Sequence, residues 1–164
     1  MEKAAATVDT DKILREHIRY LLQGGGAHID PKSALENFPA DLINVRVGKL
    51  PYTPWHVLEH MRIAQWDILE FSRDANHVSP NFPEGYWPDA GAQTGQDGWN
   101  ESLAGFLNNL KEMEELVMDR SNDLLRPIPH GTGQTIMREA LLTADHNAYH
   151  LGALMAMRKA AEGE

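Results

Sequence analysis

The chain has 164 residues, a formal net charge of −9 and no cysteine. This length suits one domain with a real hydrophobic core, so we expect residues 1–164 to form a single domain. The acidic charge argues against nucleic acid or an anionic membrane as the main partner, because both are bound mainly through Lys and Arg. The lack of cysteine excludes disulfides, thiolate metal sites and a cysteine nucleophile.

The sequence also shows no targeting or membrane-spanning segment. Its N-terminus lacks the apolar core of a signal peptide, and no apolar run approaches the ~20 residues of a membrane span. No basic cluster interrupts the acidic composition. These features predict a soluble, cytoplasmic protein with no membrane partner.

Helical patterns begin near the N-terminus. A first helix is expected to end near Gln23, with Asp9 or Asp11 as its cap and an apolar face at helical spacing. The glycines at 24–26 would stop it, and without a preceding strand they indicate a turn and no phosphate loop. A short helical segment over residues 31–38, with proline in its first turn, is expected next.

A connector over residues 39–50 precedes the second long helix. The alternation at 45–47 lacks a partner strand and is weak evidence for a strand. Thr53 and Pro54 then begin the helix, with threonine as the N-cap and proline at the first helical position. Its helical pattern continues to about Arg73.

A long segment, residues 74–98, is rich in Pro, Gly, Asn and Asp but also contains Phe82, Tyr86 and Trp87. This aromatic content is high for a solvated connector, so we expect the segment to pack over the body of the protein. Loops of this length inside a compact domain are usually functional or disordered. The composition favours a lid or pocket wall.

Two further amphipathic helices complete the pattern. The third long helix is expected to be capped by Asp97 or Asn100 and to end at residues 118–122, with apolar side chains at a spacing of three and four. A turn at 127–131 leads to the last helix, which is expected to begin at residues 132–133. Four long amphipathic helices with unequal connections predict an all-α fold, a four-helix bundle.

Two histidines lie four residues apart in the last helix. His146 and His150 project from the same face, because residues i and i+4 lie one above the other. Such a pair can offer two imidazole nitrogens to one metal ion, and catalytic zinc sites commonly use three protein ligands plus an open position. The pair therefore predicts a metal site that takes a third ligand from another helix.

His60 is the favoured third ligand among the six other histidines. It lies mid-helix beside an apolar stripe, where an unpaired imidazole would be costly to bury. His56 lies one turn earlier on the same side but close to the helix start, hence nearer to solvent. His28, His77 and His130 fall in predicted loops and are expected at the surface.

Other interpretations of these residues remain open. The segment from His56 to His60 matches the H-x-x-E-H pattern of inverted zinc peptidases, in which Glu59 would be the general base. That interpretation leaves His146 and His150 unexplained. A ferritin-like di-iron site is discarded, because E-x-x-H occurs on neither the second nor the last long helix. His146 and His150 could also be ordinary side chains of a core helix that bind no metal.

Three segments resemble the DinB-like family, and the resemblance covers nearly the whole chain. The segments are Thr53-Pro-Trp-His-Val-Leu-Glu-His60-Met-Arg-Ile-Ala-Gln-Trp-Asp-Ile-Leu-Glu-Phe, Asp97-Gly-Trp99-Asn-Glu-Ser-Leu-Ala-Gly-Phe-Leu and Asp145-His146-Asn-Ala-Tyr-His150-Leu-Gly152. The resemblance implies an up-down-down-up four-helix bundle, usually a homodimer, that binds a divalent metal through three histidines. By position these are His60, His146 and His150. One departure is visible: many relatives carry Gln after the glycine, where this chain has Ala153.

The site type and the resemblance set the expected chemistry. Zinc, nickel or iron(II) suits an all-imidazole site, with zinc and nickel favoured. The ion would lower the pKa of bound water toward ~7 or polarise a bound oxygen. Family relatives with assigned activities are S-transferases or isomerases that use a low-molecular-weight thiol, and some are described as metal-dependent hydrolases. The first hypothesis is thus a metal-dependent enzyme acting on a small-molecule substrate by thiol-dependent S-transfer or hydrolysis.

The second hypothesis is a non-enzymatic, stress-related bundle that binds a metal or another ligand. A fourth protein ligand would favour it, and an open metal position would favour the enzyme. Asp67 and Asp145 could orient imidazoles, although solvent-facing charge is their more ordinary role. Asn147 could face a pocket or the helix interface. The four tryptophans could line a pocket, but aromatic residues at helical spacing more often fill a core.

Overall fold

The computed structural model describes residues 8–163, and this part of the chain is all-α, with helices and no β-strand. The predicted fold class is therefore confirmed at the level of an all-helical protein. In chain order the helices are α1 (Thr10–Gln23), α2 (Pro31–Leu35), α3 (Pro54–Arg73), the 3₁₀ helix η1 (Glu84–Tyr86), α4 (Gln96–Met118) and α5 (Ile136–Glu162).

Two of the predicted helix starts are confirmed by their capping hydrogen bonds. Asp9 accepts a hydrogen bond from the backbone N–H of Lys12 at 3.0 Å, which fixes the start of α1. Thr53 caps α3 by accepting from the backbone N–H of His56, and the His56 ring accepts in return from the Thr53 N–H. α2 ends three residues before the predicted Phe38.

The starts of α4 and α5 differ from the prediction. α4 is capped by Gly95 without a side-chain hydrogen bond, so Asp97 lies inside its first turn, where a negative charge complements the helix dipole. α5 is capped by Thr135. The side chain of Gln134 accepts from the Thr132 N–H at 2.7 Å, which keeps residues 132 and 133 in the preceding turn.

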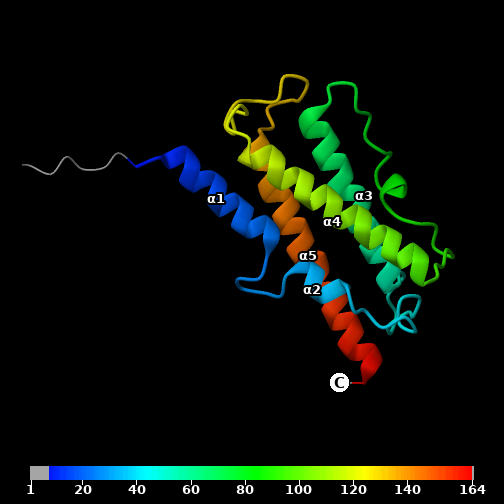
Figure 1. The fold of residues 1–164 in the computed structure, drawn as a ribbon. Coiled ribbons are helices and arrows are strands. Elements are labelled where there is room, and N and C mark those ends of the chain that lie inside the picture. The colour runs from blue at the N-terminus through cyan, green and yellow to red at the C-terminus, as the bar shows by residue number, and fades with distance from the viewer. Residues whose placement is uncertain (1–7, 164) are drawn as a thin grey trace, which may run out of the picture.

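The four long helices surround a shared core. α3 packs against α4 and α5, and α1 packs against the same two helices, while the short α2 lies across α5 (Figure 1). One hydrophobic cluster joins α2, α3, α4 and α5 around Leu58, Met61 and Phe106. A second joins α1, α3, α4 and α5 around Leu69 and Met113.

A buried arginine ties α1 to the end of α4. Arg15 is 3% exposed and donates to the backbone carbonyls of Val117, Asp119 (2.9 Å) and Asn122 (2.6 Å). The Val117 carbonyl lies in the last turn of α4, where a helix leaves acceptors without intrahelical partners, and the other two carbonyls belong to the C-cap residue and to the turn that follows it. Arg15 therefore satisfies a helix end and explains why the apolar face of α1 includes a charge.

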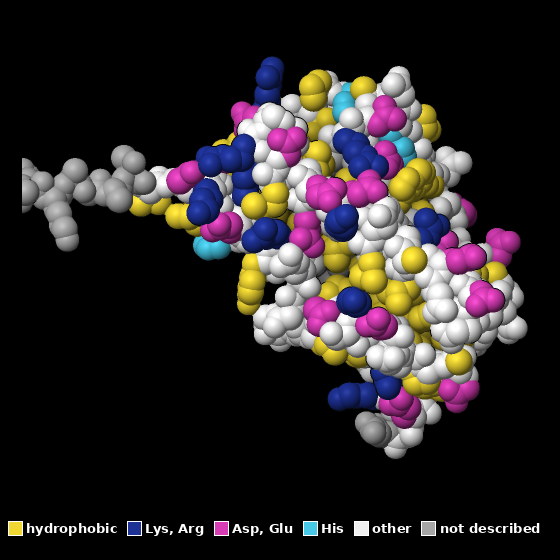
Figure 2. Space-filling model, in the orientation of Figure 1, with side chains coloured by type: hydrophobic (Ala, Val, Ile, Leu, Met, Phe, Trp, Pro, Cys, Tyr) yellow, Lys and Arg dark blue, Asp and Glu magenta, His cyan; other side chains and the backbone are white. Residues whose placement is uncertain are grey.

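Charged side chains of both signs are mixed over the face that Figure 2 shows, and hydrophobic side chains gather near its middle. Mixed charges of this kind keep large fields of one sign from forming on that face. Across residues 8–163, no helix has the length and apolarity needed to cross a bilayer.

Phe106→Ala is expected to lower the free energy of unfolding by about 3–5 kcal/mol, because Phe106 is fully buried between α3 and α4 and its truncation leaves a cavity. Denaturant unfolding followed by circular dichroism measures the change. Glu101→Ala, at an exposed position of the same helix, is the control and should change stability by less than about 0.5 kcal/mol. A loss below about 1 kcal/mol for Phe106→Ala would contradict the core assignment.

Candidate metal centre

Three histidines from two helices converge at one point. His60 comes from α3, and His146 and His150 come from α5. One ring nitrogen of each lies within 4.8 Å of the other two. The Nε2 atoms of His60 and His146 are 3.1 Å apart, close to the separation of about 3.3 Å that two nitrogens have when each is ~2.0–2.1 Å from a tetrahedral zinc ion. The predicted convergence of these three residues is present.

The tautomer of His60 suits metal ligation. Its Nδ1 lies 2.9 Å from the backbone carbonyl oxygen of Tyr86. A carbonyl only accepts hydrogen bonds, so Nδ1 carries the proton and the lone pair of Nε2 faces His146. Histidines that bind metals usually make this hydrogen bond with the nitrogen that is not the ligand, because it fixes the ring orientation.

The loop between α3 and α4 forms one wall of the centre. The ring of Trp87 stacks on His60 with a centroid distance of 3.9 Å and an interplanar angle of 5°. The expectation that this segment packs over the body holds for Tyr86 and Trp87, and Figure 1 shows the loop running back along α3. Phe82 differs, because its side chain is 81% exposed.

Asp67 holds this loop in place. Its buried carboxylate accepts from the hydroxyl of Tyr86 at 2.6 Å and lies 2.7 Å from Nε2 of His77. Two interpretations are corrected: Asp67 does not face solvent, and the His77 side chain is only 8% exposed. Asp67 touches none of the three clustered imidazoles, and it bears on His60 only through Tyr86. Burial, together with the hydrogen bond to Asp67 and its charge, raises the pKa of Tyr86 to about 12.

His56 does not belong to the centre. It is 2% exposed, so the expectation that it lies nearer to solvent is wrong. Its Nδ1 accepts from the Thr53 N–H, and its Nε2 lies 3.1 Å from the carbonyl oxygen of Asp89, to which it donates. Both ring nitrogens are therefore occupied. Glu59 is paired with Arg62 at 2.6 Å, so the arrangement of an inverted zinc peptidase is not formed.

Burial keeps the clustered imidazoles neutral. It lowers the pKa of His60, although the hydrogen bond to Tyr86 raises it in part. Burial followed by the neighbouring imidazoles lowers the pKa of His146 and of His150 to about 4. The exposed Asp145 acts on His146 only as a weak opposing charge. At neutral pH all three rings are in the form that binds metal ions.

Asn147 faces the helix interface. It is buried, and its Nδ2 donates to Oε1 of Gln65 at 2.6 Å, while Nε2 of Gln65 donates to the carbonyl oxygen of Phe106 at 2.7 Å. This chain of hydrogen bonds crosses from α5 through α3 to α4. Sequence reasoning missed Gln65, although a glutamine in the middle of an apolar helix face is a signal that could have found it.

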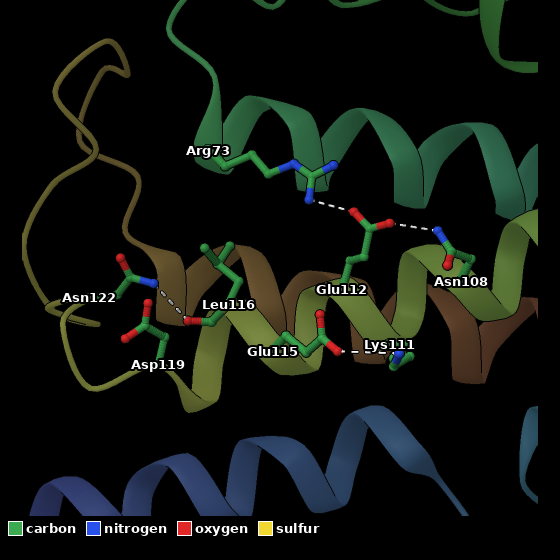
Figure 3. Close-up of a pocket in the computed structure, with 8 residues that line it drawn as sticks. All are labelled: Arg73, Asn108, Lys111, Glu112, Glu115, Leu116, Asp119 and Asn122. Atoms are coloured by element: carbon green, nitrogen blue, oxygen red, sulfur yellow. Dashed lines mark hydrogen bonds and ion pairs between the residues drawn. The ribbon is translucent and has the colours of Figure 1, made fainter.

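A polar groove on another part of the surface is not a candidate site. It has a volume of about 410 Å³ and lies between α3 and α4 (Figure 3). Arg73 pairs with Glu112, and Lys111 pairs with Glu115 at 3.5 Å. The hydrogen bond to Glu70, together with that to Glu112, raises the pKa of Arg73, and the hydrogen bond from Arg73 lowers the pKa of Glu112. These charges satisfy one another and require no ligand.

No protein-family model matches the chain, and no curated protein or solved structure matches it significantly. The resemblance to the DinB-like family consequently stays a prediction. The functional proposal depends on the geometry and protonation of the three histidines.

With a chelator present, the free energy of unfolding is expected to fall by roughly 3–4 kcal/mol between pH 7 and pH 5, nearly half of it from each of His146 and His150. The pKa values of His146 and His150 are about 4 in the folded protein, below the usual 6.5, so the unfolded chain binds more protons between these values. Stability therefore rises with pH across this window and is lost as pH falls. Urea unfolding at a series of pH values measures it. A variant with both residues changed to Asn should show a clearly smaller fall, and an unchanged pH dependence would contradict the assignment.

Proposed function

We propose that the protein binds one divalent metal ion through His60, His146 and His150 and is a metal-dependent enzyme of the DinB-like type. The observation that supports this most directly is the convergence of three neutral imidazoles within 4.8 Å, one of them already oriented by a backbone carbonyl. The reaction class is thiol-dependent S-transfer or hydrolysis of a small molecule.

The donor set fits a divalent ion. Imidazole nitrogens suit zinc, nickel and iron(II), with zinc and nickel first, since the chain has no thiolate to select a softer ion. His146 adds a second indication. Its Nδ1 is buried without a hydrogen-bond partner, and its Nε2 faces the lone pair of His60 Nε2. Two nitrogens in this position are held together by sharing either a proton or a cation.

The residues around the centre have distinct roles in this proposal. When bound, the ion supplies Lewis acidity that activates a thiol or water at neutral pH. Tyr86 orients His60 through its carbonyl, and Trp87 covers the outer face of that ring. Together they exclude water from one side of the centre and keep the lone pair of His60 directed at the ion.

The proposal includes the family's up-down-down-up topology and homodimeric assembly. Support for the topology comes from the directions of the four long helices, because α1 and α5 run one way and α3 and α4 run the other (Figure 1). Metal analysis of protein purified without added metal tests the site, and turnover with several small thiols tests the activity. Stoichiometric metal with no turnover would favour a non-enzymatic metal-binding bundle.

The double variant His146→Ala, His150→Ala is expected to lose stoichiometric zinc or nickel after dialysis, because one imidazole cannot hold the ion alone. Elemental analysis of the dialysed protein measures the loss. The matched control replaces His17 and His28, two exposed histidines, by Ala and should retain the metal. Full retention by the His146, His150 variant would refute the site.

His60→Ala is expected to weaken metal binding roughly a hundredfold or more, whereas His56→Ala should change it by less than about tenfold. The reason is that His60 directs a free Nε2 at His146, while both nitrogens of His56 bond to backbone groups. Competition with a chromophoric chelator gives both affinities. If the two variants weakened metal binding equally, His60 would not be distinguished from His56 as a ligand. His56→Ala should instead lower stability by about 0.5–2 kcal/mol, because the Thr53 N–H loses its acceptor in the capping box.

A further inference from the structure

An apolar pocket lies along α5, on the C-terminal side of His150. It has a volume of about 270 Å³, which is slightly below the range of about 300–1,000 Å³ that holds whole drug-sized ligands. A hollow of this size suits part of a small molecule. Its lining is almost entirely apolar and consists of Val47, Leu50, Tyr52, Ala153, Ala156 and Met157.

Two independent features place the pocket next to the centre. The first is helical spacing: Ala153 and Met157 follow His150 by three and seven residues, so they continue the same face of α5 at about 5 and 10 Å along its axis. The second is a stack of aromatic rings. Tyr52 stacks on Trp87 at 5.6 Å, and Trp87 stacks on His60 at 3.9 Å. One wall therefore runs from the pocket to the ligand nitrogens.

The charge at the metal centre determines which kind of chemical group binds there. The ligand group consists of three neutral imidazoles and includes no carboxylate among residues 8–163. A divalent ion held there keeps its full charge, in a half-buried setting where that charge is poorly screened. An anionic group at the open position compensates it. The pocket, in contrast, offers almost exclusively apolar contacts and no charged group.

We propose that this pocket is the subsite for an apolar substituent, so that the substrate is an amphiphilic anion with its acidic group at the metal and its tail against Ala153 and Ala156. This inference rests on the proposed metal-binding function. It adds the substrate class, because a neutral or fully polar molecule would gain nothing from the pocket.

The test uses the full-length protein loaded with cobalt(II), whose visible spectrum changes when a ligand enters an open coordination position. Straight-chain carboxylates from acetate to octanoate are titrated, and the dissociation constant of each is measured. Affinity should rise about fourfold with each added methylene until the pocket is filled, which is the usual gain for burying one CH₂ group. The spectrum itself reports binding at the metal, independently of turnover.

Ala156→Leu supplies the matched perturbation, because Ala156 is exposed at the pocket wall and a larger side chain there fills the pocket. This variant should keep the affinity for acetate and lose the dependence on chain length. Ala160→Leu makes the same change one turn further along α5, outside the pocket, and should behave like the unmodified protein.

The outcomes separate the two proposals. Failure to bind cobalt would overturn both the metal site and the subsite. Cobalt binding with equal affinity for all chain lengths would overturn the subsite alone. A flat series in which Ala156→Leu also changes the sedimentation of the protein would assign the pocket to a contact between two copies of the chain, and that too would overturn the subsite.

Discussion

The register between α3 and α5 is the constraint on which the candidate centre depends. Asn147 and Gln65 are both buried, and a buried amide without a partner is costly, so the two helices favour the alignment in which these side chains meet. Asn147 directly follows His146, and the same alignment brings His146 and His150 to His60. A slide of one turn would separate the amides and the imidazoles together. The polar contact in the core therefore specifies the geometry of the site.

The sequence predicted the parts of this arrangement that depend on local periodicity. The row of His146 and His150 follows from helical spacing, and the caps at Asp9 and Thr53 follow from residue type and the apolar pattern after them. His60 was predicted because a histidine beside an apolar stripe needs a partner. These inferences use one element at a time, and single helices are what sequence patterns describe best.

The parts that sequence reasoning missed depend on contacts between distant segments. The hydrogen-bond acceptor for His60 is a backbone carbonyl 26 residues later, and every residue type carries such a carbonyl. His77 and Asp67 were expected at the surface, because neither position shows that a loop and a helix will enclose them as a pair. His56 is buried for a similar reason, since its second partner is the carbonyl of Asp89 in the same loop.

The position of Asp67 explains why a long loop without regular structure stays against the centre. A buried carboxylate is costly unless hydrogen bonds compensate it, and both compensating groups, Tyr86 and His77, belong to the loop. If the loop moved away, the carboxylate would lose both hydrogen-bond partners, and the stacked faces of His60 and Trp87 would be exposed. The hydrogen bonds of Asp67 that hold the loop in place therefore also position the Tyr86 carbonyl, which sets the tautomer of His60. Asp67 touches none of the clustered imidazoles. By holding Tyr86 in place, it nevertheless decides which nitrogen of His60 is free to bind a metal ion.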